Sequence, residues 1–277
     1  MIDRSITPHT RRQERFRARY GPWAVVTGAS DGIGRAMAQW LAAAGLNLVL
    51  VARRREVLEP LATDLMAQYG VETRVIAADL ALASGVEAVA VGTGDLDVGL
   101  LVAAAGFGTS GRFIDSPLEQ ELDMSDVNCR AVTALVWHFG RRFAAQRRGG
   151  MVLMSSLLAF QGVPYAAHYA ATKAYVQTLA EALHVELAPL GVAVVASAPG
   201  PVYSGFATRA RMRLGMGLRP GDVAGATLDA LGRRGTVRPG ALSKTLEGAL
   251  ILLPRWARVR VMGTIMAGMT NPPTPRR

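Results

Sequence analysis

The sequence predicts one doubly wound α/β domain, in which helices cover both faces of a parallel β-sheet. Apolar runs of strand length alternate with helical patterns along most of the 277 residues. A glycine-rich turn separates the first apolar run from the first helical pattern. Half of the residues are apolar and no internal repeat is present, so the chain can bury one large core without a second domain.

The expected elements follow in order from these patterns. The first strand is the apolar run that starts at Trp23, and the helix after it ends where Gly45 interrupts the pattern. Apolar runs predict strands at residues 23–27, 47–52, 73–78, 98–103, 150–155, 192–198 and 235–238. Helical patterns cover residues 33–44, 55–69, 84–91, 117–146, 165–189 and 221–231. Ligands of such sheets bind beyond the carboxyl ends of the strands, so the residues that follow the strands are candidates for function.

Two segments flank the predicted domain, which covers residues 23–240. Residues 1–22 are polar and rich in arginine, so we expect a basic arm and not a secretory signal. Residues 241–277 predict an amphipathic helical extension, with apolar residues at helical spacing: Leu242, Leu246, Ala249, Leu250, Leu253, Trp256, Val259, Met262, Ile265, Met266 and Met269. Charged residues interrupt it, so no stretch can span a bilayer. We expect either helices packed on the domain or a dimer partner, or an interfacial pair near the substrate entrance with arginines toward anionic headgroups. In the second case the extension would close over an apolar pocket.

The turn after the first strand reads Thr27-Gly-Ala-Ser-Asp-Gly-Ile-Gly34, with a G-x-x-x-G-x-G spacing of glycines. Glycines permit a tight turn and a close approach of the backbone to a ligand. The helix that follows presents free N–H groups and the positive end of its dipole. The segment therefore predicts a pyrophosphate site, although an ordinary glycine-rich surface turn has the same composition.

Ser156 stands 13 residues before Tyr169, and Lys173 follows that tyrosine at helical spacing. A tyrosine and a lysine four apart on a helix share one face, so the ammonium can lie beside the phenol. A nearby positive charge favours the phenolate, and we therefore expect the pKa of Tyr169 to lie below its usual value of about 10. Such a tyrosine can exchange protons near neutral pH, with Ser156 holding a carbonyl oxygen. A tyrosine–lysine pair alone also fits a solvated helix face.

These motifs, in this order, resemble the short-chain dehydrogenase/reductase family, in particular its hydroxysteroid dehydrogenase and 3-oxoacyl reductase branch. The resemblance implies a Rossmann-like fold and a catalytic set of Asn128, Ser156, Tyr169 and Lys173. It also implies a cofactor site made of Gly28, Ser30, Asp31, Gly32, Ile33, Gly34, Arg53, Asp79, Leu80, Ala105, Gly106, Tyr169, Lys173, Pro199, Gly200, Val202 and Ser204. The family usually has Asn-Asn-Ala-Gly where this chain has Ala103-Ala104-Ala105-Gly106, and the missing amides normally brace the central sheet.

The same resemblance implies hydride transfer between a nicotinamide cofactor and a carbonyl or alcohol group. Tyr169 exchanges the proton with the substrate oxygen, Ser156 hydrogen-bonds that oxygen, and Lys173 holds the nicotinamide ribose. Asn128 supports a water that relays protons to Lys173. Apolar residues around these positions indicate a lipophilic substrate (a ketone, steroid or acyl chain), and they are Leu157, Leu158, Phe160, Val163, Tyr165, Tyr203, Phe206 and Met212.

The end of the second strand indicates which cofactor is bound. A chain that binds NAD needs a carboxylate there for the ribose 2′-OH. Here Ala52 is followed by Arg53, Arg54 and Arg55, and guanidinium groups bind a 2′-phosphate through paired hydrogen bonds. We therefore expect NADP(H), with Arg53 as the phosphate ligand and reduction as the cellular direction. Arg54 and Arg55 also fit the solvated start of a helix.

The formal net charge of +10 comes almost entirely from arginine, since Lys173 and Lys244 are the only lysines. The arginines form separate clusters, and no aromatic-interleaved stripe or DNA-binding helix pattern accompanies them, so we do not expect a nucleic-acid partner. The single cysteine, Cys129, excludes an internal disulfide, and the histidines lack zinc-ligand spacing. We interpret His168 as a helix-surface residue, with contact to the substrate beside Tyr169 as the alternative. We expect a cytoplasmic homodimer or homotetramer; the alternative functions are a non-catalytic NADP-binding sensor or scaffold, and a membrane-tethered structural protein.

Overall fold

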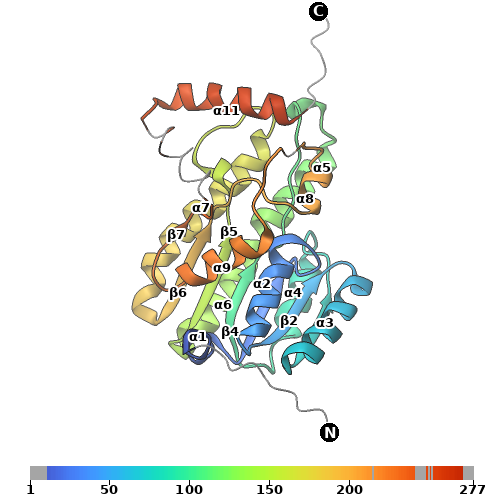
Figure 1. The fold of residues 1–277 in the computed structure, drawn as a ribbon, viewed down its shortest axis with the longest axis vertical. Coiled ribbons are helices and arrows are strands. Elements are labelled where there is room, and N and C mark those ends of the chain that lie inside the picture. Colours follow the sequence, from blue (N-terminus) through green and yellow to red (C-terminus); the bar gives the residue numbers. More distant parts are fainter. Residues whose placement is uncertain (1–10, 214, 241–247, 249, 251, 271–277) are drawn as a thin grey trace, which may run out of the picture.

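The computed structural model describes residues 11–213, 215–240, 248, 250 and 252–270. Within them a seven-stranded parallel sheet has the order β3-β2-β1-β4-β5-β6-β7 (Figure 1). Its strands are β1(Trp23–Thr27), β2(Asn47–Ala52), β3(Thr73–Ala77), β4(Val98–Ala103), β5(Gly149–Met154), β6(Val192–Ser197) and β7(Thr236–Val237). The predicted fold class is confirmed, and each predicted strand is present with small shifts at its ends.

The chain enters this sheet at its centre. Strand β1 pairs with β2 on one side and with β4 on the other, so that Val25 is aligned with both Val49 and Leu101. After β3 at one edge, the chain crosses back to begin β4 beside β1. This reversal of strand order produces a crevice beyond the carboxyl ends of β1 and β4, which is the usual ligand site in such sheets.

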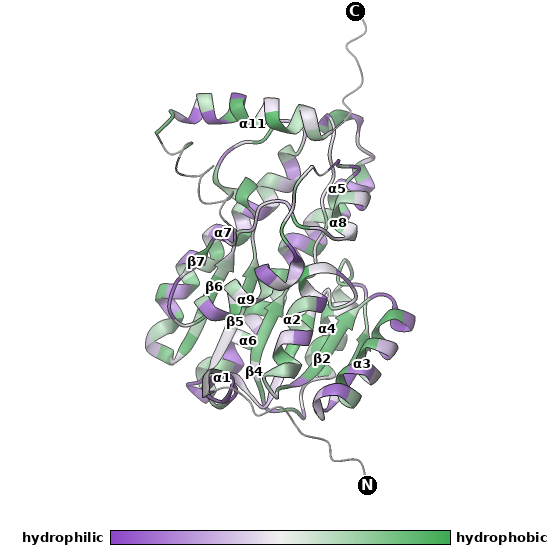
Figure 2. Ribbon diagram, in the orientation of Figure 1, coloured by the Kyte–Doolittle hydropathy of each residue, from purple (hydrophilic) through white to green (hydrophobic). Residues whose placement is uncertain are grey.

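Helices cover both faces of the sheet. One face packs against α1(Arg11–Tyr20), α2(Gly32–Ala43), α3(Arg55–Tyr69) and α9(Pro220–Ala230). The other face packs against α4(Ala83–Val91), α6(Val132–Gln146) and α7(Ala167–Leu187). Because both faces are covered, the inner strands are apolar at successive positions, and Figure 2 shows them in green between helices whose outer turns are purple.

Helix α1 is a regular element inside the predicted basic arm, and the sequence analysis did not predict it. The Phe16 ring lies 5.0 Å from the Trp40 ring of α2, measured between centroids. Tyr20 is buried, and the Gly21 N–H donates to the Arg17 carbonyl oxygen at 2.8 Å. Although the segment is rich in charged residues, Phe16 and Tyr20 are four residues apart and share one face of α1. These two aromatic side chains pack the helix against the core.

A π-helical segment divides the predicted helix 117–146. Helix α5(Leu118–Ser125) follows Pro117 and runs into the π-helical turn η2(Asp126–Ala131), which continues as α6. Such turns occur often at functional sites because they displace one residue from the regular helix. This turn carries Asn128, whose side chain is buried.

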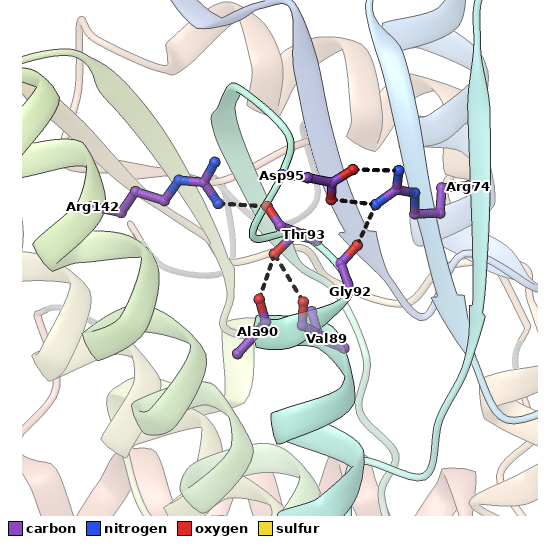
Figure 3. A network of polar contacts seen from close by, with 7 residues as sticks. All are labelled: Arg74, Val89, Ala90, Gly92, Thr93, Asp95 and Arg142. Atoms are coloured by element: carbon purple, nitrogen blue, oxygen red, sulfur yellow. Dashed lines mark hydrogen bonds and ion pairs between the residues drawn. The ribbon is translucent and has the colours of Figure 1, made fainter.

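Two arginines stabilise the turn between α4 and β4 (Figure 3). Arg74 of β3 donates to both carboxylate oxygens of Asp95, at 2.6 and 2.9 Å, and to the Gly92 carbonyl oxygen at 2.8 Å. Arg142 of α6 donates to the Thr93 carbonyl oxygen at 2.8 Å. Both therefore satisfy backbone carbonyls beyond the end of α4, so part of the arginine excess has a structural role.

The elements beyond the carboxyl end of the sheet form a separate layer (Figure 1). It contains the 3₁₀ turn η3(Leu157–Phe160), α8(Gly205–Arg209) and α11(Arg255–Met269). Helix α11 buries Met262 and Met266 in a cluster with Val163, Ala166 and Ala170. The second predicted tail helix is thus present and packs on the domain, whereas the first falls largely outside the described residues. No helix of the described part is both long and apolar enough to cross a bilayer.

Candidate active site

A cavity of about 1070 Å³ lies at the carboxyl end of the sheet, between the turns that follow β1 and β4. Every residue predicted to hold the cofactor lines it: Gly28, Ser30, Asp31, Gly32, Ile33, Gly34, Arg53, Asp79, Leu80, Ala105, Gly106, Tyr169, Lys173, Pro199, Gly200, Val202 and Ser204. Ser156 lines it too, whereas Asn128 is buried behind its wall. The cavity is one site with a glycine-rich end and a tyrosine–lysine end.

Backbone geometry accounts for the glycines between β1 and α2. Gly28 and Gly32 have φ values of 69° and 53°, a region that residues with a Cβ rarely adopt. A Cβ on Gly34 would lie 2.3 Å from the Gly28 carbonyl oxygen, so α2 starts directly against the turn. Asp31 caps α2 by accepting from the Gly32 N–H at 2.7 Å. The N-terminus of α2 therefore faces the cavity, which fits a bound pyrophosphate.

Thr27 links β1 to the end of β4 and the segment that follows it. Its hydroxyl donates to the Val102 carbonyl oxygen at 3.3 Å and accepts from the Ala105 N–H at 3.0 Å. A Cβ on Gly28 would lie 2.9 Å from the Ala104 carbonyl oxygen, so the turns after β1 and β4 touch through their backbones. The small residues after β4 are compatible with this close packing.

The end of β2 presents positive charge to the cavity. Arg53 and Arg54 line it, next to Ala52, in agreement with the predicted position of Arg53. Arg55 instead pairs with Glu59 at 3.3 Å on the exposed surface of α3. Of the three consecutive arginines, Arg53 and Arg54 therefore line the cavity, and Arg55 lies on the surface of α3.

Strand β5 and helix α7 bring Ser156, Tyr169 and Lys173 together. Ser156 follows β5 and caps η3, where its hydroxyl accepts from the Leu158 N–H at 3.2 Å. On α7, the ammonium nitrogen of Lys173 lies 5.8 Å from the centroid of the Tyr169 ring. The same ammonium donates to the Met154 carbonyl oxygen at 2.8 Å. The three groups are therefore fixed against one wall of the cavity.

Burial controls the pKa values of the tyrosine and the lysine. Burial raises the pKa of Tyr169 from 10.0 to about 12, and the hydrogen bond with Ser156 opposes this rise. Burial lowers the pKa of Lys173 from 10.5 to about 8. The prediction of a lowered tyrosine pKa is wrong, because desolvation of the buried phenolate outweighs the hydrogen bond with Ser156. At neutral pH, both side chains therefore carry their protons.

Asn128 holds the segment that follows β4. Its Oδ1 accepts from the Phe107 N–H at 3.1 Å, while its Nδ2 donates to the Phe107 carbonyl oxygen at 2.9 Å and to the Thr172 hydroxyl at 3.0 Å. A Cβ on Gly106 would lie 2.9 Å from Asn128 Oδ1 and 3.3 Å from Lys173 Nζ. Asn128 and Lys173 thus both lie beside Gly106. The role of Asn128 in a proton relay stays a prediction.

A partly buried contact beside Tyr169 was not predicted. His168 Nδ1 lies 2.6 Å from Glu121 Oε2, and His168 Nε2 lies 2.9 Å from the Ser125 hydroxyl. Glu121 is only 3% exposed, so this contact ties α5 to the first turn of α7. The interpretation of His168 as a helix-surface residue is wrong. Nothing in the local sequence indicates that partners 47 residues apart meet here.

The apolar wall differs in part from the predicted one. Four predicted residues line the cavity, namely Leu157, Leu158, Phe206 and Met212. Four others do not, namely Phe160, Val163, Tyr165 and Tyr203. Val163 and Tyr165 instead belong to the cluster under α11. Three residues that the sequence analysis did not assign also line the cavity, namely Phe107, Val127 and Met216. Met262, Ile265, Met266 and Met269 of the C-terminal extension complete the wall, as the expectation that this extension closes over an apolar pocket implied.

Comparison with known proteins agrees with this geometry. The family model described as short chain dehydrogenase matches residues 22–214. A 7beta-hydroxysteroid dehydrogenase of Collinsella aerofaciens is 36% identical over 179 residues, which are 65% of this chain and 68% of that protein. A solved structure titled for 7beta-hydroxysteroid dehydrogenase stereoselectivity has a TM-score of 0.83 at 30% identity, covering 89% of this chain and 98% of its own. A short-chain dehydrogenase from Sphingobium yanoikuyae in complex with NADPH has a TM-score of 0.75 at 30% identity, covering 86% and 98%.

Proposed function

The chain belongs to the short-chain dehydrogenase/reductase family of oxidoreductases, and on this premise we propose that it is an NADPH-dependent reductase of lipophilic ketones. One observation carries the proposal: Ser156, Tyr169 and Lys173 share a cavity with the glycine-rich turn and Arg53. Proton-transfer groups beside a phosphate-binding turn suit a reaction between a dinucleotide and a carbonyl compound.

Tyr169 is the proposed donor of the proton that the carbonyl oxygen receives. With a pKa of about 12, its phenol keeps its proton at neutral pH, which is the form that reduction requires. The Ser156 hydroxyl hydrogen-bonds the same oxygen and stabilises the negative charge that develops there. The charge of Lys173 stabilises the phenolate that remains after proton transfer. A bound nicotinamide dinucleotide supplies the hydride for the carbonyl carbon.

The choice of NADP(H) rests on the end of β2. Arg53 lines the cavity where an NAD-binding chain has a carboxylate for the ribose 2′-OH. The NADPH complex of the Sphingobium yanoikuyae protein, whose fold is similar, supports this choice.

The lipophilic substrate rests on the methionine-rich wall. Five methionines contribute to it from two distant segments: Met212 and Met216 after α8, and Met262, Met266 and Met269 on α11. Methionine side chains adapt to irregular apolar shapes. The names of the related hydroxysteroid dehydrogenases agree with a bulky apolar ketone.

NADPH oxidation with ketones of graded size, including steroid ketones, 3-oxoacyl thioesters and small hydrophilic ketones, tests the proposal. We expect turnover of bulky apolar ketones, and a loss of roughly 10²- to 10⁴-fold in Tyr169→Phe with nearly unchanged NADPH binding. Tyr175→Phe on the same helix is the matched control, because Tyr175 does not line the cavity. A protein that binds NADPH but turns over none of these compounds would instead be a sensor or scaffold.

A further inference from the structure

Helix α8 begins at the glycine-rich turn. The Gly205 N–H donates to Asp31 Oδ2 at 2.9 Å, while the other oxygen of Asp31 caps α2. A Cβ on Gly32 would lie 2.9 Å from the Ser204 Cβ, so the two segments are in direct contact. The residues of α8 then continue along the same cavity.

Arg209 ends α8 and also lines the cavity. Its guanidinium carbon lies 4.0 Å from the centroid of the Phe107 ring. A stack of this kind fixes the guanidinium plane and leaves its N–H groups free to bind an anion. Burial and then the charge of Arg53 lower the pKa of Arg209, while Asp79 and Asp123 act in the opposite direction. Arg209 and Arg53 are therefore close enough in one cavity to repel each other.

Four other arginines of the described chain form salt bridges within 4 Å: Arg55 with Glu59, Arg74 with Asp95, Arg130 with Asp126, and Arg148 with Asp97. Among the described residues, neither Arg53 nor Arg209 has such a bridge. Neighbouring guanidinium groups without a bridging carboxylate are stabilised when an anion with several oxygens binds between them, because each group can give two parallel hydrogen bonds.

We propose that Arg209 and Arg53 together bind the 2′-phosphate of NADP(H), so that Arg209 determines cofactor preference. This inference rests on the proposed function, because it concerns the same cofactor. The 2′-phosphate is assigned because Arg53 follows β2, where the adenosine ribose binds, whereas the pyrophosphate has the N-terminus of α2. Helix α8 then connects the two ends of the cavity, since the Phe206 ring lies 5.3 Å from the Tyr169 ring between centroids.

Calorimetric titration of the full chain with NADPH, NADH and 2′,5′-ADP tests this assignment. Arg209→Gln should weaken the binding of NADPH and of 2′,5′-ADP by roughly 10- to 100-fold, the usual effect of losing a charge-assisted hydrogen bond, and leave NADH binding nearly unchanged. Arg209→Lys should lie between the two, since it keeps the charge but not the planar fork. Arg213→Gln is the matched control, because this exposed arginine of the same segment does not line the cavity.

Each other outcome contradicts the assignment in a recognisable way. Equal weakening of NADPH and NADH would place Arg209 on the pyrophosphate. Unchanged binding of 2′,5′-ADP by Arg209→Gln, with a melting temperature equal to that of the wild type, would show that Arg209 binds no phosphate. A wild-type protein that binds neither dinucleotide would refute the proposed function itself, whereas NADPH binding that is indifferent to Arg209 would refute this inference alone.

Discussion

At the scale of single residues, Lys173 links the site to the stability of the protein. It is 6% exposed, and burial lowers its pKa from 10.5 to about 8. Below about pH 8, the lysine is charged in both the folded and the unfolded state, so the folded protein bears the full cost of burying the charge. Between pH 8 and 10.5 the unfolded chain still holds the proton that the folded protein has released. The cost therefore decreases as the pH rises through this window.

Lys173→Met makes this linkage measurable, because methionine has similar length and does not titrate. The free energy of unfolding of the wild type minus that of the variant should be constant below about pH 7.5. Above about pH 8 it should increase in favour of the wild type, by up to about 1.4 kcal/mol per pH unit. Urea unfolding of both proteins from about pH 6.5 to 9.5 measures the difference. A flat difference over the whole range would show that the buried lysine keeps its ordinary pKa.

At the scale of elements, α11 adapts a general fold to a particular cavity. Met262 and Met266 are buried and anchor the helix, while Ile265 lines the cavity and remains partly exposed. Met262, Met266 and Met269 line the cavity as well, so Ile265 is the position of this helix that lines the cavity without belonging to the buried cluster. A change at a contact position can alter the cavity without removing the packing that holds the helix.

Ile265→Ala should change substrate preference more than stability. Deleting part of an apolar contact in a pocket costs on the order of 1–2 kcal/mol, so kcat/KM for a bulky ketone should decrease by roughly 5- to 30-fold. A small ketone that does not reach α11 should be reduced as before. Thr264→Ala on the same helix is the control, because Thr264 does not line the cavity. An equal decrease for both ketones would mean that α11 acts on the catalytic groups and not on substrate size.

The elements also show what the sequence could predict. Strands covered on both faces produce uninterrupted apolar runs, and the helices between them follow a clear periodicity, so the sheet was predictable from local pattern. Helix α8 has only five residues, which is too short for a helical periodicity to be recognised in the sequence. The π-helical turn around Asn128 could not be predicted either, because its apolar pattern is that of an α-helix. The motif residues Tyr169 and Lys173 were predictable from their spacing. Arg209 was not, because its place in the cavity depends on how a distant segment crosses the sheet.

At the scale of the whole molecule, the outer face of α11 combines apolar and cationic side chains. Trp256 is 64% exposed, and Val261 is 37% exposed on the same helix. The Arg260 guanidinium carbon lies 5.2 Å from the Trp256 ring centroid. An exposed indole beside a guanidinium suits the headgroup region of an anionic membrane. The predicted peripheral membrane contact therefore has a specific surface on which it can be tested.

Exchange of both apolar residues, as Trp256→Ser with Val261→Ser, should reduce co-sedimentation with vesicles that contain anionic lipid. Binding of the wild-type protein to these vesicles should weaken as salt is added. The attraction between the arginines and the anionic headgroups is then screened over about 10 Å at 0.1 M salt. Val185→Ser is the control, since Val185 is 71% exposed on α7, away from this helix. If the double variant binds vesicles as the wild type does, the face of α11 is not the membrane contact.

The position of α11 along the chain has a consequence for how such proteins diversify. The family-wide match ends at residue 214, so the glycine-rich turn, Tyr169 and Lys173 lie within the shared part, while α11 lies beyond it. The residues that carry out the reaction and the part of the cavity wall that α11 provides are thereby separated along the gene. Mutations, insertions or exchanges in the last part of the chain can give paralogues new substrate ranges while leaving the proton-transfer residues under unchanged selection.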